Sequence, residues 1–238
     1  MLSNLNRQTP SSAVAIFRVN LHQDPTVLER VSQILSTDER ARAARLRYER
    51  GSERFIAGRG ALRIVLGNAL GIAPEGVRLR TRPNGKPELN EQDSNIRFNL
   101  SHSADLALIA VADGREVGID VERLRPIDID GLAERFFAAR ECAEIKGLPL
   151  DLRMLGFFQC WTRKEAYLKA TGEGLSFPLD RFIVSLIPGD PARLIEVIDR
   201  PDETDRWSLH SLDLGLEYVG ALVAEGANVV VRLESFEF

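Results

Sequence analysis

Two carboxylates separated by one residue stand at the end of an apolar segment and could hold a metal ion. The segment from Val117 to Glu122 is rich in residues that favour a strand. Side chains alternate between the two faces of a strand, so Asp120 and Glu122 should point to the same side. Adjacent carboxylates repel each other unless a cation lies between them, and oxygen ligands suit Mg²⁺ or Mn²⁺. Taken alone, such a pair is more often a solvated turn that follows a strand.

A third carboxylate, Glu165, lies in a segment that has the periodicity of a helix. On a helical wheel it shares one face with Trp161 and Leu168. An acid on a face that packs inward is costly unless it is paired or bound to a metal. Lys169 follows four residues later on the same side, so an ordinary surface ion pair is the alternative. With the two strand acids, this helix would form a metal site beside a lysine that can hold a phosphate.

Composition excludes several other classes of function. The chain has 238 residues, a net charge of −4 and no apolar run of transmembrane length, so we expect neither a nucleic-acid nor a membrane partner. Its two cysteines, Cys142 and Cys160, have no metal-site spacing, which favours a reduced, cytoplasmic setting. Three histidines are too few for a histidine-based zinc site.

Positive charge is concentrated between Arg40 and Arg63. This stretch holds eight arginines, opposed only by Glu49 and Glu53. Guanidinium groups match the oxygens of phosphate, so the stretch could bind a phosphate-rich ligand or an acidic partner. A solvated helix face is the alternative.

The pattern of apolar residues and turn signals predicts an α+β fold with largely antiparallel sheets. In the first half we expect a strand at 13–19, a helix at 25–35, a long helix at 38–70 capped by Ser36 or Thr37 and either continuous or broken near Gly51, a turn-rich loop at 82–87, and strands at 96–99, 106–112 and 117–121. After a linker at 123–126 we expect helices at 130–137 and 139–146, a helix around Trp161 that ends at Gly172, and strands at 181–186, 192–197, 207–212, 218–224 and 229–233.

A third motif, from Phe98 to Ser103, stands at the end of a predicted strand. Ser101 and His102 could offer a hydroxyl group and an imidazole to an anion, or could simply end the strand with local hydrogen bonds. A Ser-His hydrolase is disfavoured, because adjacent residues on a strand face opposite ways.

Together these motifs resemble those of the Sfp-type 4′-phosphopantetheinyl transferases, in the order and at spacings similar to those of that family. The resemblance covers most of the chain, from about Ser36 to Phe182. The matching pieces are Asn84-Gly85-Lys86-Pro87, Phe98-Asn99-Leu100-Ser101-His102-Ser103, Gly118-Ile119-Asp120-Val121-Glu122 and Trp161-x-x-Lys164-Glu165-Ala166-x-x-Lys169. Each piece is weak alone, whereas the four in register are specific.

The resemblance implies two similar α/β lobes related by a pseudo-twofold axis, with the active site between them. We place the N-terminal lobe at 1–122 and the C-terminal lobe at 123–238, and expect a monomer. It also implies Mg²⁺-dependent transfer of phosphopantetheine from coenzyme A to a serine of an apo acyl or peptidyl carrier protein. Adenosine 3′,5′-bisphosphate would be the other product.

The resemblance also implies a role for individual residues. Asp120, Glu122 and Glu165 match the metal-binding acids, and Asp120, Glu165 and Lys169 would be catalytic. The residues expected to contact coenzyme A are Arg42, Arg54, Arg59, Lys86, Ser101, His102, Lys164 and Lys169. Two positions depart from the pattern or add nothing to it: Glu39 stands where some members have a basic residue, and Val121 has no side-chain ligand to offer.

Carrier proteins of this class are usually acidic, so a basic or apolar surface should receive them. Candidates for that surface are Arg135, Phe136, Phe137, Arg140 and Arg153, although the two phenylalanines fit a core somewhat better. Two rival functions use the same residues. One is a metal-dependent phosphohydrolase or nucleotidyl transferase, and the other is a non-catalytic module that binds coenzyme A.

Overall fold

The computed structural model describes residues 13–81, 87–90, 94–174 and 177–238, and its fold is α+β, as the sequence predicts. The helices are α1 (Pro25–Gln33), α2 (Thr37–Ala44), α3 (Glu49–Leu70), α4 (Ile129–Phe136), α5 (Ala139–Gly147), α6 (Leu150–Thr171) and α7 (Glu203–Arg206). The strands are β1 (Ala13–Asn20), β2 (Leu79–Thr81), β3 (Pro87–Leu89), β4 (Ile96–Ser103), β5 (Leu106–Asp113), β6 (Val117–Arg123), β7 (Phe182–Val184), β8 (Leu194–Val197), β9 (Trp207–Leu212), β10 (Tyr218–Glu225) and β11 (Val230–Phe236). None of the helices described is both long and apolar enough to cross a bilayer.

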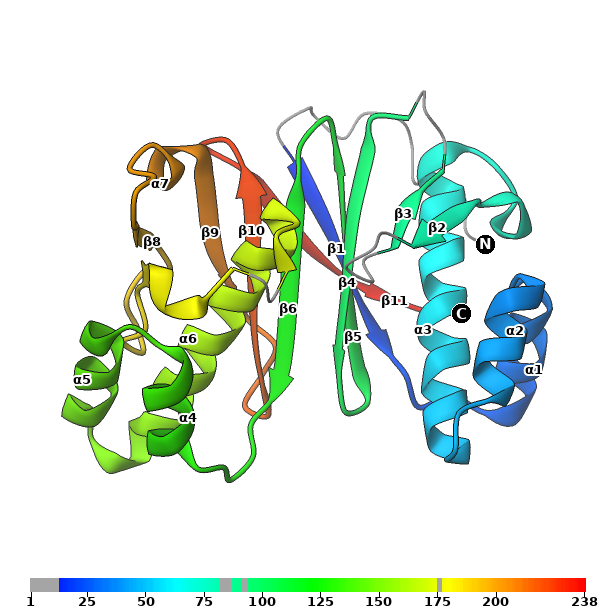
Figure 1. Cartoon of the computed structure of the whole chain (residues 1–238). Helices are drawn as coiled ribbons and strands as arrows, with labels where there is room; N and C mark the ends of the chain where they lie inside the picture. Colours follow the sequence, from blue (N-terminus) through cyan, green and yellow to red (C-terminus); the bar gives the residue numbers. More distant parts are fainter. Residues whose placement is uncertain (1–12, 82–86, 91–93, 175–176) are drawn as a thin grey trace.

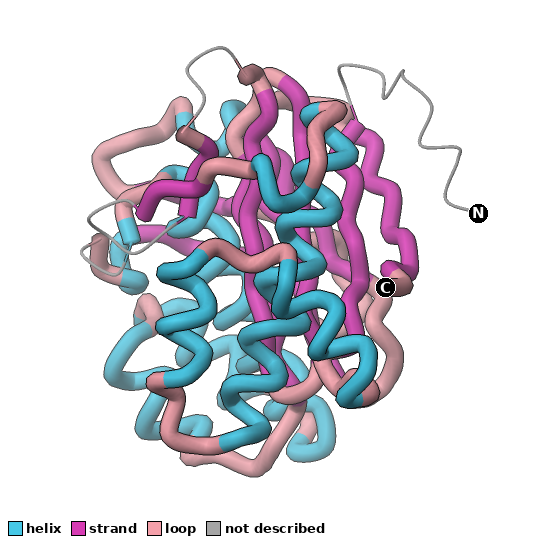
Figure 2. The backbone as a smooth tube through the Cα atoms, turned by 90° about the vertical axis from the view of Figure 1, so that its right-hand side faces the viewer, coloured by secondary structure: helices cyan, strands magenta, loops and turns pink. Residues whose placement is uncertain are grey.

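Two main sheets stand next to each other in the middle of the molecule. One has the strand order β11-β1-β5-β4 and the other β6-β10-β9 (Figure 1). Helices α1, α2 and α3 lie on the outer side of the first sheet, and α4, α5 and α6 lie on the outer side of the second (Figure 1). Seen from the side of α1–α3, these helices lie in front of the strands (Figure 2). All pairings in the main sheets are antiparallel except that of β11 with β1, which is parallel.

Three clusters of buried apolar side chains form the core. One lies under α3, a second under α6, and the third lies between the two sheets and includes Ile16, Leu108, Ile119 and Leu222. This central cluster takes side chains from both sheets, so burial of one apolar surface holds the two halves together.

The sheets do not follow the boundary expected between residues 122 and 123. Strand β6 crosses that boundary at its last residue and pairs with β10, and β11 lies after it but returns to pair with β1. The division into parts 1–122 and 123–238 stays a prediction.

The break in the arginine-rich helical region lies earlier than expected. Helix α2 ends at Ala44 and α3 begins at Glu49, so the region is broken as two helices, but a few residues before Gly51. Gly51 lies in the first turn of α3, where a glycine is tolerated. The expected cap is confirmed: the Ser36 hydroxyl accepts a hydrogen bond from the Glu39 amide, and the Glu39 side chain accepts one from the Ser36 amide.

Helix α6 packs unusually close to β6, and a glycine makes this possible. A Cβ atom on Gly118 would lie 2.1 Å from the carbonyl oxygen of Ala166 and 2.3 Å from the amide nitrogen of Ala170. Only a residue without a side chain fits there. Helix α6 ends, as predicted, at Gly172, whose φ is 75°.

Candidate active site

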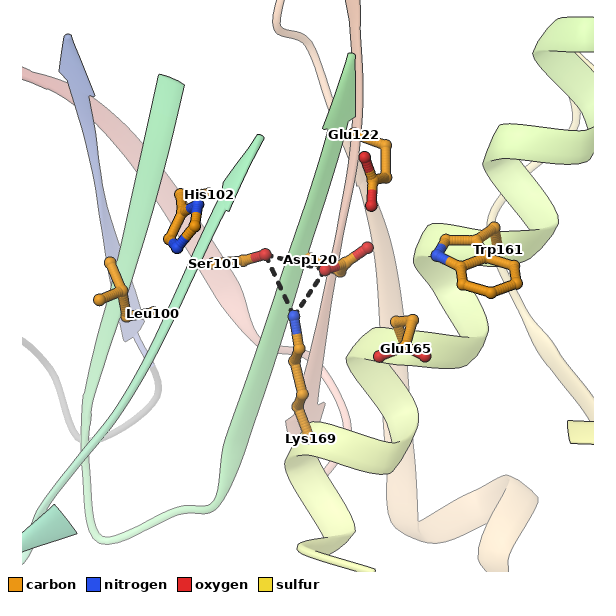
Figure 3. A pocket seen from close by; sticks show the side chains of 8 residues that line it. All are labelled: Leu100, Ser101, His102, Asp120, Glu122, Trp161, Glu165 and Lys169. Carbon is orange, nitrogen blue, oxygen red and sulfur yellow. Dashed lines mark hydrogen bonds and ion pairs between the residues drawn. The ribbon is translucent and has the colours of Figure 1, made fainter. Parts of the chain in front are cut away.

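A pocket of about 330 Å³ lies between α6 and the strands β4 and β6, within the range typical of small-molecule sites. Figure 3 shows its side chains: three come from α6, two from β6 and three from β4. They are Trp161, Glu165 and Lys169; Asp120 and Glu122; and Leu100, Ser101 and His102. Because positions 161, 165 and 169 are four apart, they form one stripe on the helix, and Gly118 brings that stripe against β6.

Asp120 is the most buried carboxylate of the pocket, with 4% of its surface exposed. Its Oδ1 accepts hydrogen bonds from the Ser101 hydroxyl at 2.8 Å and from the Lys169 ammonium at 2.6 Å (Figure 3). Its Oδ2 is also buried but has no hydrogen-bond partner among the residues described. A buried charged oxygen without a partner is costly and indicates that a donor or a cation belongs there.

The negative charge of Asp120 acts on the other two acids of the pocket, Glu122 and Glu165. Burial and then the charge of Asp120 raise the pKa of Glu122, opposed by the hydrogen bond that its Oε2 accepts from Ser103 at 2.8 Å. Burial and the charges of Asp120 and Glu122 likewise raise the pKa of Glu165, with Lys169 acting in the opposite direction. The three carboxylates therefore repel one another, and a cation in the pocket would relieve that repulsion.

These residues fit a divalent cation that takes part of its ligands from a substrate. Within the described part of the chain, no three His, Cys, Asp or Glu side chains are already gathered closely enough to enclose an ion. Mg²⁺ does not require such a cage, because in phosphate-handling sites it takes one or two carboxylates and keeps water and phosphate oxygens as its other ligands. The unpartnered Oδ2 of Asp120 and the nearby acids supply that kind of incomplete set.

Lys164 does not lie in the pocket. Its side chain is fully buried outside the pocket lining, where it forms an ion pair with Glu141 at 2.8 Å and donates to the carbonyl oxygens of Leu179 and Phe182. Glu141, also fully buried, accepts from the amide of Val184 as well. In the structure Lys164 thus joins α5, α6 and β7, and its predicted contact with coenzyme A stays a prediction.

The arginines predicted to bind phosphate lie apart from the acids, on and beside α3. Arg54 forms an ion pair with Asp105 at 2.7 Å. Arg42 and Arg59 both lie against the ring of Phe55, at 5.2 and 5.6 Å from its centroid. Arg59 also pairs with Glu39 at 3.5 Å. Lys86 lies outside the described residues.

Glu39, where a basic residue was expected from the resemblance, makes structural contacts in this protein. In addition to capping α2, it forms a 2.6 Å ion pair with Arg63, which is 3% exposed and donates to two backbone carbonyls. This acid ties α2 to α3, so it has a structural contact in this protein.

His102 lies at the exposed rim of the pocket, and no described hydrogen bond joins it to Ser101. Loss of hydration and the positive charges of Lys169 and Arg54 lower the pKa of His102, which favours the uncharged imidazole. Arg54 is close enough to influence this pKa, which connects the arginine-rich helix to the pocket.

The residues proposed for a carrier surface differ in how far they are buried and in their partners. Phe137 is 4% exposed and packs on Phe157, so it belongs to the core. Phe136 is half-buried, with its ring edge to face with Trp161 at 5.8 Å, and Arg135 lies over it at 5.0 Å. Of the others, Arg140 pairs with Glu144, and Arg153 donates to the carbonyl oxygens of Lys146 and Leu148.

Four residues of the site and its support were not given a role from the sequence. Leu100 and Trp161 line the pocket, Ser103 binds Glu122, and Glu141 anchors α6 through Lys164. Strand alternation was a signal for Ser103, because positions 101 and 103 share a face just as 120 and 122 do. No local signal marks Glu141, since its partner is distant in sequence.

Comparison with known proteins identifies the family to which the chain is similar. Residues 116–223 match a family model described as the 4′-phosphopantetheinyl transferase superfamily, and residues 23–113 match one described as 4′-phosphopantetheinyl transferase, N-terminal. The chain is 44% identical over 219 residues to the 4′-phosphopantetheinyl transferase HetI of Nostoc sp., covering 91% of this chain and 89% of HetI. It is 35% identical over 167 residues to psf-1 of Bacillus pumilus (70% of each chain) and 30% identical over 158 residues to Sfp of Bacillus subtilis (66% and 69%).

The structure defines a class of protein that has an α+β fold and an acidic pocket next to a lysine. The chain belongs to the 4′-phosphopantetheinyl transferase superfamily.

Proposed function

We propose that this protein transfers the 4′-phosphopantetheine arm of coenzyme A to a serine hydroxyl of an apo acyl or peptidyl carrier protein. Adenosine 3′,5′-bisphosphate is the leaving product, and Mg²⁺, or Mn²⁺ in its place, is the cofactor. The observation that supports this most strongly is the gathering of three carboxylates and Lys169 in one pocket of a chain of this family.

In the proposed mechanism, Asp120, Glu122 and Glu165 would hold the metal ion, which when bound would supply positive charge to the pyrophosphate of coenzyme A. The serine oxygen forms a bond to the β-phosphorus while the bond to the bridging pyrophosphate oxygen breaks. The serine proton passes to Glu165 or to a water molecule. Lys169 neutralises the negative charge that develops on the departing phosphate.

The nucleotide end of coenzyme A would lie toward α3. Arg42, Arg54 and Arg59 supply positive charge there, with Lys86 as a further contact. We assign the 3′-phosphate to Ser101 and His102, with the uncharged imidazole acting as an N–H donor. Lys164 is left out of this set because all of its described contacts are inside the core.

We also infer that the molecule consists of two lobes related by a pseudo-twofold axis, with the pocket between them. Each main sheet carries helices on its outer side, which supports this arrangement (Figure 1). One chain supplies the whole pocket, so we expect a monomer to be active. A cytoplasmic setting, where coenzyme A is available, is compatible with two free cysteines.

The test is the mass of an apo carrier protein after incubation with the enzyme, coenzyme A and Mg²⁺. We expect the carrier to gain the mass of the arm, and Asp120→Asn to lower the rate by about 10²–10⁴, the cost typical of one electrostatic group. Asp113→Asn, which changes an exposed acid at the end of β5, should keep the wild-type rate. A near-wild-type rate in Asp120→Asn would remove that residue from the mechanism.

The same experiment separates the rival functions. A phosphohydrolase or nucleotidyl transferase would consume its nucleotide without adding mass to the carrier. A binding module would retain coenzyme A and leave it unchanged with or without metal. Chelation by EDTA should abolish transfer and be reversed by added Mg²⁺, and transfer that persists in EDTA would contradict the metal requirement.

A further inference from the structure

Strands β4 and β6 lie next to each other but belong to different sheets, and side chains join them. Three alternate residues of β4 make this connection. The Asn99 side chain accepts from the amide of Ile119 at 2.8 Å, Ser101 donates to Asp120 at 2.8 Å, and Ser103 donates to Glu122 at 2.8 Å. We call these three residues of β4 the seam.

Ser103 occupies the outermost position of the seam and contacts β6 twice. Its hydroxyl donates to Oε2 of Glu122 and accepts from the backbone amide of Arg123 at 3.1 Å. The acceptor bond fixes the hydroxyl against the backbone of β6, so its proton is directed at the carboxylate. A hydroxyl held in this way restricts the rotation of the flexible Glu122 side chain.

We propose that Ser103 is a positioning residue that orients Glu122 for the metal ion. This inference rests on the proposed function, because it takes Glu122 as a metal ligand. Ser103 itself touches neither metal nor substrate. It leaves Oε1 of Glu122 as the oxygen available to the ion, and it holds that oxygen on the same side of β6 as Asp120.

Direct metal binding tests the proposal without relying on turnover. Mn²⁺ affinity is measured by calorimetry on the full chain, wild type and variants, in the presence of adenosine 3′,5′-bisphosphate. We expect Ser103→Ala to weaken Mn²⁺ binding by about 10-fold or more, the cost typical of losing a group that holds a ligand. Ser103→Thr keeps the hydroxyl and should recover most of the affinity.

Ser208 provides a matched control. It is a half-buried serine on β9 that donates one hydrogen bond, to the carbonyl oxygen of Ala224, and it lies outside the pocket. Ser208→Ala should bind Mn²⁺ as wild type does. In steady-state assays, Ser103→Ala should raise the Mg²⁺ concentration needed for half-maximal rate while leaving the KM for coenzyme A within about two-fold, a split that general loosening of the fold would not produce.

A double-mutant cycle shows whether Ser103 acts through Glu122. If it does, Ser103→Ala should have little further effect on Mn²⁺ affinity in a Glu122→Gln background. Equal affinities of wild type and Ser103→Ala, or full additivity with Glu122→Gln, would overturn the positioning role. Absence of Mn²⁺ binding by wild type would instead contradict the metal site of the proposed function.

Discussion

At the scale of single residues, the pocket combines charged groups whose burial costs the folded protein stability. Three acids share one cavity, and one buried carboxylate oxygen has no partner among the residues described. Such arrangements lower the stability of the protein without its ligands, and they are typical of functional sites.

Glu165 should lower the stability of the metal-free protein at neutral pH. Burial and the charges of Asp120 and Glu122 raise its pKa above the ordinary value of 4.5. The folded protein thus holds this proton to a higher pH than the unfolded chain does, so the free energy of unfolding falls as the pH rises from 4.5 through the raised pKa. In Glu165→Gln that loss should disappear, and the metal-free variant should be more stable than wild type at neutral pH while transferring no phosphopantetheine.

Urea denaturation in EDTA across a pH series measures this effect. The difference between variant and wild type should shrink as the pH falls below 4.5, and added Mg²⁺ should reduce it at neutral pH by stabilising the wild type. Glu234→Gln, at an exposed position on β11, is the control and should follow the wild-type curve. A Glu165→Gln protein less stable than wild type at neutral pH would contradict the account.

Lys164 should behave as a structural residue. In Lys164→Met, the buried charge of Glu141 would lose its partner, which typically costs about 3–5 kcal/mol of unfolding free energy. Changing Glu141 to Gln in the same chain should recover part of that loss, because no uncompensated charge remains. Urea denaturation measures both, with the exposed Lys146→Met as a control that changes stability little. A large rise in the KM for coenzyme A at unchanged stability would instead support the predicted contact between Lys164 and coenzyme A.

At the scale of elements, the position of α6 against β6 decides whether the acids of one meet the acids of the other. Gly118→Ala would place a methyl group within 2.3 Å of backbone atoms of α6, which cannot rotate away as a side chain can. We expect a loss of about 1–3 kcal/mol in stability. Transfer should also slow, since α6 must shift and take Glu165 and Lys169 with it.

Thermal unfolding and the carrier assay measure the two effects of Gly118→Ala. Gly147→Ala, at the end of α5 where an added Cβ meets nothing within 4 Å, is the matched control and should leave both unchanged. Unaltered stability and rate in Gly118→Ala would show that the contact between α6 and β6 is looser than described.

Much of the site could be predicted from the sequence because its signals are local. Strand alternation placed Asp120 and Glu122 on one side, and helical periodicity placed Glu165 with Lys169; the pocket contains all four. Lys164 belongs to the same motif, and the resemblance assigned it to coenzyme A. Its burial depends on Glu141, an acid of another helix, and pairing between distant segments has no periodicity to read.

The strands show the same limit at the level of elements. Alternation predicted that 229–233 and 117–121 are strands, and both are, as β11 and β6. It could not assign them to sheets, because the choice of partner depends on how the whole chain packs. The break between α2 and α3 was placed a few residues late because a glycine is the obvious breaker, whereas α2 ends at Ala44, before Gly51.

At the scale of the whole molecule, the central apolar cluster should make the two halves unfold together. Both tryptophans, Trp161 and Trp207, pack in the cluster under α6, so their fluorescence reports on the second half. Leu62 is fully buried in the cluster under α3, in the first half. Leu62→Ala typically costs about 2–5 kcal/mol, and in a cooperative molecule it should lower the fluorescence midpoint in urea as much as the midpoint by circular dichroism.

Independent halves would give a different result. The fluorescence midpoint of Leu62→Ala would then stay at the wild-type value while circular dichroism showed two transitions. That outcome would support a division near residue 122 into separately folding domains and contradict the role of the central cluster.

The parallel pairing of β11 with β1 has a consequence for biosynthesis. During translation, β1 leaves the ribosome before every other described strand and β11 after all of them. The first sheet can therefore be completed only when β11 has emerged, and until then β1 presents an open edge to its surroundings. We expect nascent chains to depend on chaperones to shield that edge, and the slowest step in maturation to be the insertion of the final strand.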